Sequence, residues 1–200
     1  LIERHVVLKA LKEGICPLKT NCPECLKSGE YSLSKEIELG FYVWKGPLGR
    51  FVVAAKGSFH KRSVYGFGCG QDLEVAKKKA FFEISPRLAL LLKSAKEELK
   101  VMAANKHFLF HWYEDSIWTD NFFKDQLFEM PEVDTDISKQ DIWVGSFELP
   151  KELKDIGIHA VKAVSPKMQQ LFTGEWSIEK LNPAAVTESG KLPPEMHMIG

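Results

Sequence analysis

The sequence lacks an excess of charge of either sign, and it lacks any long apolar run. Lys and Arg together number 27 and Asp and Glu also number 27, so the formal net charge is zero. A chain without net charge has no general attraction for nucleic acid or anionic lipid, and we expect neither as a partner. The longest aliphatic run covers only residues 88–92, whereas a membrane-spanning helix needs about 20 apolar residues. The sequence therefore predicts no membrane span.

Cysteines are few, and glycosylation sequons and an initiator methionine are missing. The chain contains four cysteines and no Asn-x-Ser/Thr sequence, which argues against a disulfide scaffold and favours a reducing cytoplasm. It begins at Leu1, inside a predicted helix and without the pattern of a signal peptide. We therefore expect a cytoplasmic protein, processed or cut from something longer.

What is present is the composition of a globular chain, with 44% apolar and 27% charged residues. The order of elements predicts an α+β fold with mixed α/β layers, in a single domain of residues 1–200. Four parts are expected in sequence order. They are a helix over residues 1–15, a Cys-containing connection over 16–35, an α/β core over 36–164 and an irregular tail over 165–200.

Within the predicted core, the first expected feature is a β-hairpin, because strand-like runs at 39–44 and 51–55 flank the turn residues 46–49. A strand over residues 64–70 then ends in a glycine turn, and a helix follows with Asp72 as its N-cap. Pro86 is expected to kink this long helix into two segments, since proline lacks a backbone N–H and clashes with the preceding turn. Residues 142–149 and 158–164 look extended, with a brief helix over 150–153 between them.

Three cysteines have spacing that suits a metal. Cys22 and Cys25 are separated by two residues, a spacing at which two thiolates bind one zinc ion, and Cys16 is a possible third ligand. A fourth ligand is not evident. The alternative is that these are loop cysteines without a chemical role.

The glycine turn at residues 66–70 has two interpretations. Successive glycine amides before a helix N-terminus can cradle a phosphate. The segment nevertheless lacks the third glycine of the dinucleotide fingerprint and the Gly-Lys-Ser/Thr of the P-loop, which favours a tight turn between strand and helix.

Glu83 is the acidic residue of the following helix that stands out. It neighbours Phe81 and Phe82, and we place it on the face opposite the lysines at 77, 78 and 79. A buried carboxylate needs a partner, so Glu83 is a candidate metal ligand or general acid–base group. The alternative is a carboxylate solvated at the edge of the helix.

Together these residues resemble the YcaO family, and three segments in the family's order carry the resemblance. The main one reads Gly66-x-Gly68-x-Gly70-x-Asp72-x-Glu74-x-Ala76-x3-Ala80-x2-Glu83. Ile2-Glu3-Arg4-His5 is similar to the end of the family's first motif, Ser-x-x-Glu-x-x-Glu-Arg. The proline and apolar run at residues 165–174 is similar to the segment after the family's last strand. The chain would then be the C-terminal part of a YcaO domain.

The resemblance implies an enzyme that uses ATP to activate the backbone amides of a peptide, for azoline formation or for thioamidation. Phosphorylation turns the amide oxygen into a good leaving group, and Mg²⁺ held by carboxylates neutralises the triphosphate. Carried over to this chain, Glu3 and Glu83 would bind or orient Mg²⁺, Arg4 would face phosphate, and Asp72 would remain a helix cap.

Departures from the family pattern leave other functions open. Family members commonly carry a glutamine and then an arginine after the glutamate; here Pro86 and Leu91 occupy such places, and the basic residue Arg87 is out of position. We therefore expect that these 200 residues alone do not assemble a complete ATP site. The alternatives are a catalytically degenerate YcaO-like subunit that binds a peptide or partner protein, with a homodimer possible, and an unrelated zinc-bearing interaction module.

Overall fold

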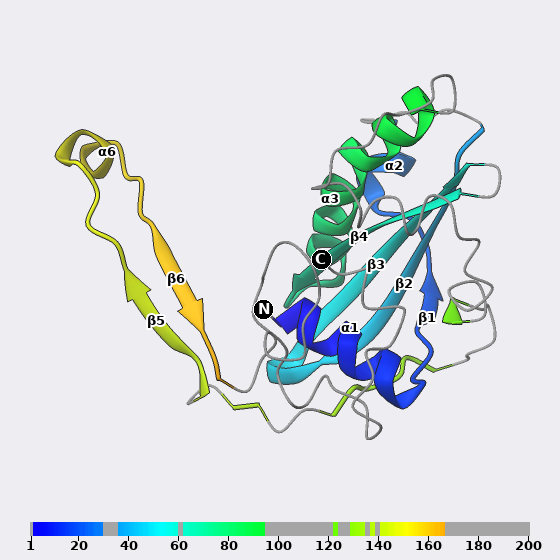
Figure 1. Cartoon of the computed structure of the whole chain (residues 1–200), viewed down its shortest axis with the longest axis horizontal. Coiled ribbons are helices and arrows are strands. Elements are labelled where there is room, and N and C mark those ends of the chain that lie inside the picture. The colour runs from blue at the N-terminus through cyan, green and yellow to red at the C-terminus, as the bar shows by residue number, and fades with distance from the viewer. Residues whose placement is uncertain are drawn as a thin grey trace.

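The computed structural model describes residues 2–29, 36–59, 62–94, 122–123, 129–134, 137–138 and 141–166. These residues form a four-stranded antiparallel sheet with a helix on each face, and a separate two-stranded ribbon that projects to one side (Figure 1). The predicted α+β class is confirmed.

The four strands lie in sequence order across the sheet. They are β1 (Leu18–Thr20), β2 (Glu38–Gly46), β3 (Arg50–Phe59) and β4 (Arg62–Gly70). The predicted hairpin is β2 and β3, joined by the short 3-10 turn η1 (Pro47–Gly49), in which Leu48 and Gly49 both have positive φ. Since successive side chains of a strand point to opposite faces, each strand contributes to two separate cores.

One core lies between the sheet and helix α1 (Ile2–Glu13). Tyr42, Trp44 and Val52 face this helix, and Val6 and Val7 of α1 are completely buried against them. The helix ends at Gly14, whose φ of +68° is a left-handed conformation that glycine adopts without strain. Helix α1 lies within the range of residues 1–15 for which the sequence predicts a helix.

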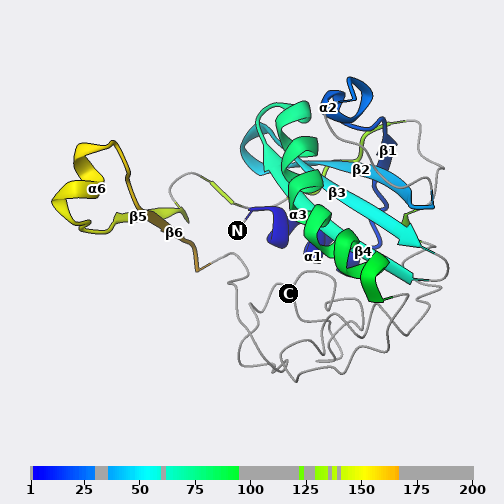
Figure 2. The same ribbon diagram turned by 90° about the horizontal axis from the view of Figure 1, so that it is seen from above.

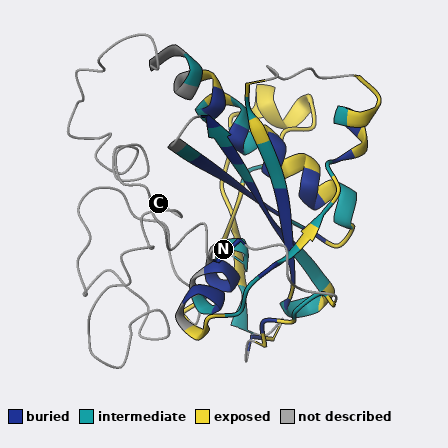
Figure 3. Cartoon of the chain, turned by 90° about the vertical axis from the view of Figure 1, so that its right-hand side faces the viewer, coloured by how far each residue is buried: buried dark blue, intermediate teal, exposed yellow. Residues whose placement is uncertain are grey.

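The other core lies between the sheet and helix α3 (Leu73–Ser94). Phe41, Val43 and Val53 point to this side, and Ile84 and Leu88 of α3 are buried against them. Figure 3 shows the buried residues along the strands and on the helices that cover them. None of the helices in the described ranges is long and apolar enough to cross a membrane.

The prediction of a glycine turn at residues 66–70 is wrong, because these glycines lie inside strand β4. A Cβ atom at Gly66 would lie 2.6 Å from the carbonyl oxygen of Ala80, and one at Gly68 would lie 2.2 Å from that of Ala76. Glycines on the strand and alanines on the helix thus let two backbones approach each other. Only Gln71 and Asp72 separate β4 from α3, and Asp72 caps the helix as predicted, accepting a hydrogen bond of 3.0 Å from the Val75 N–H.

The prediction that Pro86 divides the long helix is also wrong, since α3 is one continuous element through Pro86. Proline removes one backbone hydrogen bond, whose acceptor would be the carbonyl of Phe82. Both Pro86 and Phe82 are exposed, so that carbonyl lies on the solvent side of the helix. Packing of Ile84 and Leu88 on the sheet holds the helix on both sides of the proline.

The connection predicted for residues 16–35 contains two short elements, β1 and helix α2 (Glu24–Lys27). Strand β1 exists because Leu18, Lys19 and Thr20 pair with β2, an interaction between residues distant in sequence that leaves no local pattern. Residues 30–35 of the predicted connection lie outside the described part of the chain.

The ribbon consists of β5 (Trp143–Ser146), helix α6 (Lys151–Asp155) and β6 (Val161–Val164). Both extended segments and the helix between them agree with the sequence. The sequence placed them in the α/β core, whereas in the structure they form a sheet of their own, and all of β5 and α6 is exposed. Figure 2 shows the ribbon projecting away from the main sheet. Of the predicted irregular tail, only Ser165 and Pro166 are described.

Candidate functional site

The outer edge of strand β4 brings charged side chains together. Because β4 is the last strand of its sheet, the backbone groups of every second residue point away from the sheet. Three residues of α3, spaced four apart and therefore on one side of the helix, reach these groups. Lys79 Nζ donates to the carbonyl oxygen of Cys69 at 3.1 Å, Glu83 Oε2 accepts from the N–H of Phe67 at 3.1 Å, and Arg87 donates to the carbonyl oxygen of Tyr65.

Glu83 and Arg87, both predicted as nucleotide or Mg²⁺ ligands, form an ion pair along this edge. Glu83 Oε1 lies 3.2 Å from a guanidinium nitrogen of Arg87, with 37% and 24% of the two side chains exposed. Glu83 is thus at the edge of the helix, accessible from solvent and already oriented by two partners. The prediction that Glu83 lies on the face opposite the three lysines is wrong for Lys79. Lys79 lies one helical turn before Glu83 on the same side of α3.

Glu3, the predicted carboxylate of the first motif, lies in the first turn of α1 close to the end of β4. Burial raises the pKa of the Cys69 thiol, and the negative charge of Glu3 raises it further, while Arg50 and Lys79 act in the opposite direction. Glu3, Arg50 and Lys79 are therefore close enough to Cys69 for their charges to act on its thiol. A raised thiol pKa keeps Cys69 protonated at neutral pH, which argues against a role as nucleophile.

Arg4 belongs to α1, next to Glu3, and its side chain lies outside the described residues. Its predicted contact with phosphate stays a prediction. Glu3, Glu83 and Arg87 are therefore the predicted site residues whose side chains line β4 and its neighbours.

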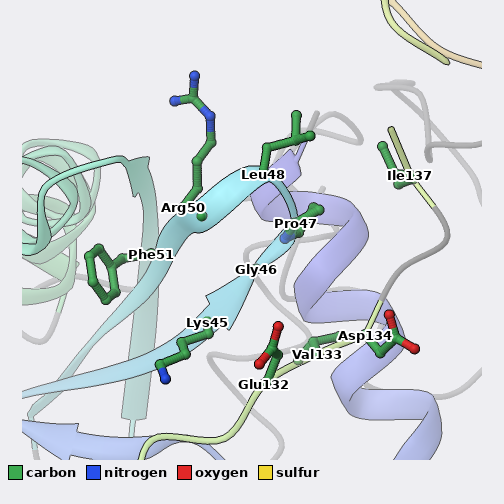
Figure 4. Close-up of a pocket in the computed structure, with 11 residues that line it drawn as sticks. Lys45, Gly46, Pro47, Leu48, Arg50, Phe51, Glu132, Val133, Asp134 and Ile137 are labelled. Carbon is green, nitrogen blue, oxygen red and sulfur yellow. The ribbon is translucent and has the colours of Figure 1, made fainter. Parts of the chain in front are cut away.

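Arg50 and Lys79 are site residues that the sequence did not reveal. Arg50 is the first residue of β3, and its Nε is buried without a hydrogen-bond partner among the described residues. In Figure 4 its side chain points away from Glu132 and Asp134, the acidic residues across the β2–β3 turn. An isolated arginine after a turn carries no sequence signal. Lys79 could have been found from helical spacing, because it precedes Glu83 by four residues.

A separate hollow of about 370 Å³ lies at the β2–β3 turn, where residues 131–133 run beside the end of β2 (Figure 4). The N–H of Lys45 donates to the carbonyl oxygen of Pro131 at 2.8 Å, and the N–H of Val133 donates to that of Lys45 at 2.9 Å. The lining carries both signs of charge, and Arg50 is its one residue shared with the β4 edge. The hollow at the β2–β3 turn therefore does not provide a second candidate site with charged groups of one kind directed at a common point.

The three candidate zinc ligands do not come together. Cys16 packs on the core under α1, whereas Cys22 and Cys25 pack on the core under α3. All four cysteines are free, and in the described ranges no three His, Cys, Asp or Glu side chains could hold a metal. The short strand β1 lies between Cys16 and Cys22, which explains why sequence proximity does not become a common site.

Comparison with known proteins gives matches among solved structures. A heterocyclase in complex with substrate and cofactor matches 82% of this chain with a TM-score of 0.61 and 18% identity, and the match covers 25% of the heterocyclase. The heterocyclase TruD matches 90% of this chain with a TM-score of 0.52 and 17% identity, over 30% of its own length. No protein-family model matches the sequence, and no curated protein matches it.

The chain thus spans between a quarter and a third of the length of the heterocyclases that it matches. At 17–18% identity the likeness establishes the fold. The YcaO-like fold expected from the motifs is confirmed in this sense: the chain has the α+β fold of part of a heterocyclase.

Proposed function

We propose that this chain is part of an ATP-dependent enzyme that activates the backbone amides of a peptide, for heterocycle formation or for thioamidation. The observation that carries the proposal is that strand β4 has predicted site residues at two places: Glu83 pairs with Arg87 beside Phe67, and Glu3 lies close enough to Cys69 for its charge to act on the thiol. Glu3 and Glu83 come from two helices on opposite faces of the sheet and lie 80 positions apart in sequence.

The charges along β4 suit a magnesium nucleotide. Mg²⁺ is commonly bound by one or two carboxylates together with substrate phosphates, and Glu3 and Glu83 supply two carboxylates. Arg50, Lys79 and Arg87 supply cations, and a guanidinium can bind phosphate with two parallel hydrogen bonds. A preformed cluster of three acidic ligands is not required for such a site.

Each residue then has a definite task. A bound nucleotide would supply the phosphoryl group that makes the amide oxygen a leaving group. Glu83 is held in one orientation by the Phe67 N–H and by Arg87, so its carboxylate needs little reorganisation to receive a cation. Arg50 and Lys79, whose charges act on Cys69 in the sense opposite to that of Glu3, would face the phosphate charge. Cys69 remains a neutral thiol.

Calorimetric titration of Mg-ATP into the full-length protein, as wild type and as Glu83→Gln, tests the proposal. Glutamine can still accept the Phe67 hydrogen bond but loses the charge, so the fold should persist while affinity falls by about tenfold or more, equivalent to about 1.4 kcal/mol or more. Glu74→Gln is the matched control, because Glu74 also lies on α3 and pairs with Lys77 instead. Equal affinity of the wild type and Glu83→Gln would contradict the proposal.

The second candidate is a non-catalytic subunit of the same fold that holds a peptide or a partner protein. The observation that favours it is the ribbon, which exposes Trp143, Val144 and Ile156 to solvent. A folded full-length wild-type protein that does not bind Mg-ATP would support this function over the first.

A further inference from the structure

Helix α3 carries apolar residues on its solvent-facing side as well as on the side that packs on the sheet. Val75 and Phe82 are 48% and 45% exposed, and Pro86 and Ala89 are exposed as well. At 3.6 residues per turn, these four residues lie within an arc of about 60° around the helix axis. Single exposed apolar residues are common on protein surfaces, whereas these four form one stripe, which we call the outer stripe of α3.

Lysines border the outer stripe on both sides. Lys78 lies at one margin, where its Nζ is 5.6 Å from the centre of the Phe82 ring. Lys79 lies at the other margin and reaches the edge of β4. The acidic residues of α3 lie beyond these margins and are paired with basic residues of the same helix. The solvent-facing side of α3 is therefore apolar along its middle and positively charged along its borders.

One end of the outer stripe opens into a hollow of about 370 Å³ between α3 and the short helix α2. The lining of this hollow includes Val75 and Lys78 on α3, and Pro23 and Cys25 on the side of α2. The hollow has room for a large apolar side chain beside Val75. The surface therefore offers a place to receive a side chain as well as side chains that project.

The sheet-facing side of α3 is apolar too, with Ala80, Ile84 and Leu88 buried. A helix that is apolar on both sides is typically buried between two layers. Among the described residues, the main sheet is the layer that packs on α3 (Figure 2). The larger part of each matched heterocyclase lies outside its match with this chain. A second layer on α3 is therefore expected to come from outside residues 1–200.

We infer that a partner protein docks on the outer stripe of α3 through an amphipathic helix with acidic residues beside its apolar positions. The stripe runs from Val75 to Ala89, about 21 Å along the axis, so a partner helix of about four turns covers it. Apolar residues at such helical spacing are the usual contacts between two helices. Acidic residues of the partner would face the bordering lysines, and complementary charge of this kind selects the partner and its orientation. The docking does not require a bound nucleotide.

Fluorescence anisotropy of a dye-labelled synthetic helix, titrated with the full-length protein, tests the inference. The probe is a peptide of about three heptads with Leu at its apolar positions and Glu at the positions beside them, and a second probe carries Lys in place of Glu. The Glu peptide should bind about tenfold more tightly than the Lys peptide, because lysines border the stripe.

Phe82→Ser and Val75→Ser remove apolar side chains from the stripe, and each should weaken binding of the Glu peptide by about tenfold. Both side chains are about half exposed, so circular dichroism should show an unchanged fold. Lys78→Glu should weaken binding of the Glu peptide and strengthen binding of the Lys peptide. A loss of folding would not produce such a reversal.

Trp143→Ser is the matched control, since Trp143 is a 69% exposed apolar residue on the ribbon, away from α3 (Figure 1). This variant should bind the Glu peptide like the wild type. Absence of binding by the wild type would overturn the inference. Equal binding of the two peptides would overturn it as well, and so would wild-type affinity in both serine variants of α3.

Discussion

Glycines occupy opposite environments in the two sheets of this molecule. In β4, Cβ atoms at Gly66 and Gly68 would lie 2.2–2.6 Å from backbone atoms of α3, whereas one at Gly145 in β5 would meet nothing within 4 Å. In the first case the missing side chain lets a helix approach the strand. In the second it leaves an open place on the surface. A glycine in a strand can therefore mark either the close approach of another backbone or an open place on the surface. Only the element packed against the glycine distinguishes the two cases.

The largest effect is expected from Gly68→Val. The added side chain would collide with the carbonyl oxygen of Ala76 and the backbone nitrogen of Ala80, neither of which can turn away as a side chain could. Overpacking of this kind costs typically about 1–3 kcal/mol and occasionally more, and we expect about 3 kcal/mol or complete loss of folding.

Urea denaturation measures this cost, with Gly145→Val as the control. Because Gly145 is surrounded by open space, its variant should unfold within about 0.5 kcal/mol of the wild type. Similar destabilisation by the two substitutions would contradict the assignment of the cost at Gly68 to packing against α3.

A smaller effect is expected from Glu83→Ala, which removes the acceptor for the Phe67 N–H and the partner of Arg87. Loss of a hydrogen bond at a partly accessible site should lower the free energy of unfolding by about 1 kcal/mol. Glu83→Gln keeps an acceptor and should lose less. Lys78→Ala, which removes a lysine near the exposed Phe82 ring, serves as a neutral control. Urea denaturation measures the free energy of unfolding of the three variants. A Glu83→Gln variant as unstable as Glu83→Ala would contradict this prediction.

The smallest effect is expected on the pH dependence of stability, through Glu74 on α3. Burial would raise the pKa of Glu74, but hydrogen bonds from Lys77 and from the N–H of Glu24 outweigh it and hold the pKa below 4.5. A lowered pKa in the folded state stabilises the protein above the unfolded value, and this contribution disappears as the pH falls through the folded pKa. Since 43% of the side chain is exposed, solvent limits the gain to about 0.5 kcal/mol.

The stability difference between the wild type and Glu74→Gln, followed from about pH 7 to about pH 3, should therefore shrink toward zero at the acid end. A difference that does not change with pH would exclude this carboxylate as its source.

The elements that could be predicted from sequence are those set by residues close together in the chain. The β2–β3 hairpin follows from two apolar runs around a turn, α1 ends at a glycine, and Asp72 caps α3. Strand β1 and the packing of Gly66 on α3 depend on partners far along the chain, which a local pattern does not contain.

The candidate site divides in the same way. Glu3 and Glu83 can be predicted from the sequence because each occupies a set position in a motif that resembles one of the YcaO family. Arg87 can be predicted because it is the basic residue that follows Glu83, although it is out of position for the family pattern. Lys79 is concealed in the sequence by its place in a run of three lysines, although helical periodicity separates it from Lys78. Arg50 reaches the site only through the pairing of β3 with β4, so no reading of its neighbours in sequence could have revealed it.

The row of Lys79, Glu83 and Arg87 along β4 also bears on how this protein stays in solution during folding. An open strand edge is a template on which other chains can add and aggregate. Here the side chains of α3 occupy the outward backbone groups of β4, and the opposite edge strand, β1, is only three residues long. The same three residues proposed to bind a nucleotide thus close the sheet against amyloid-like growth. A substitution that removes the Glu83 carboxylate would therefore be expected to lower the solubility of the protein, even before any nucleotide is added.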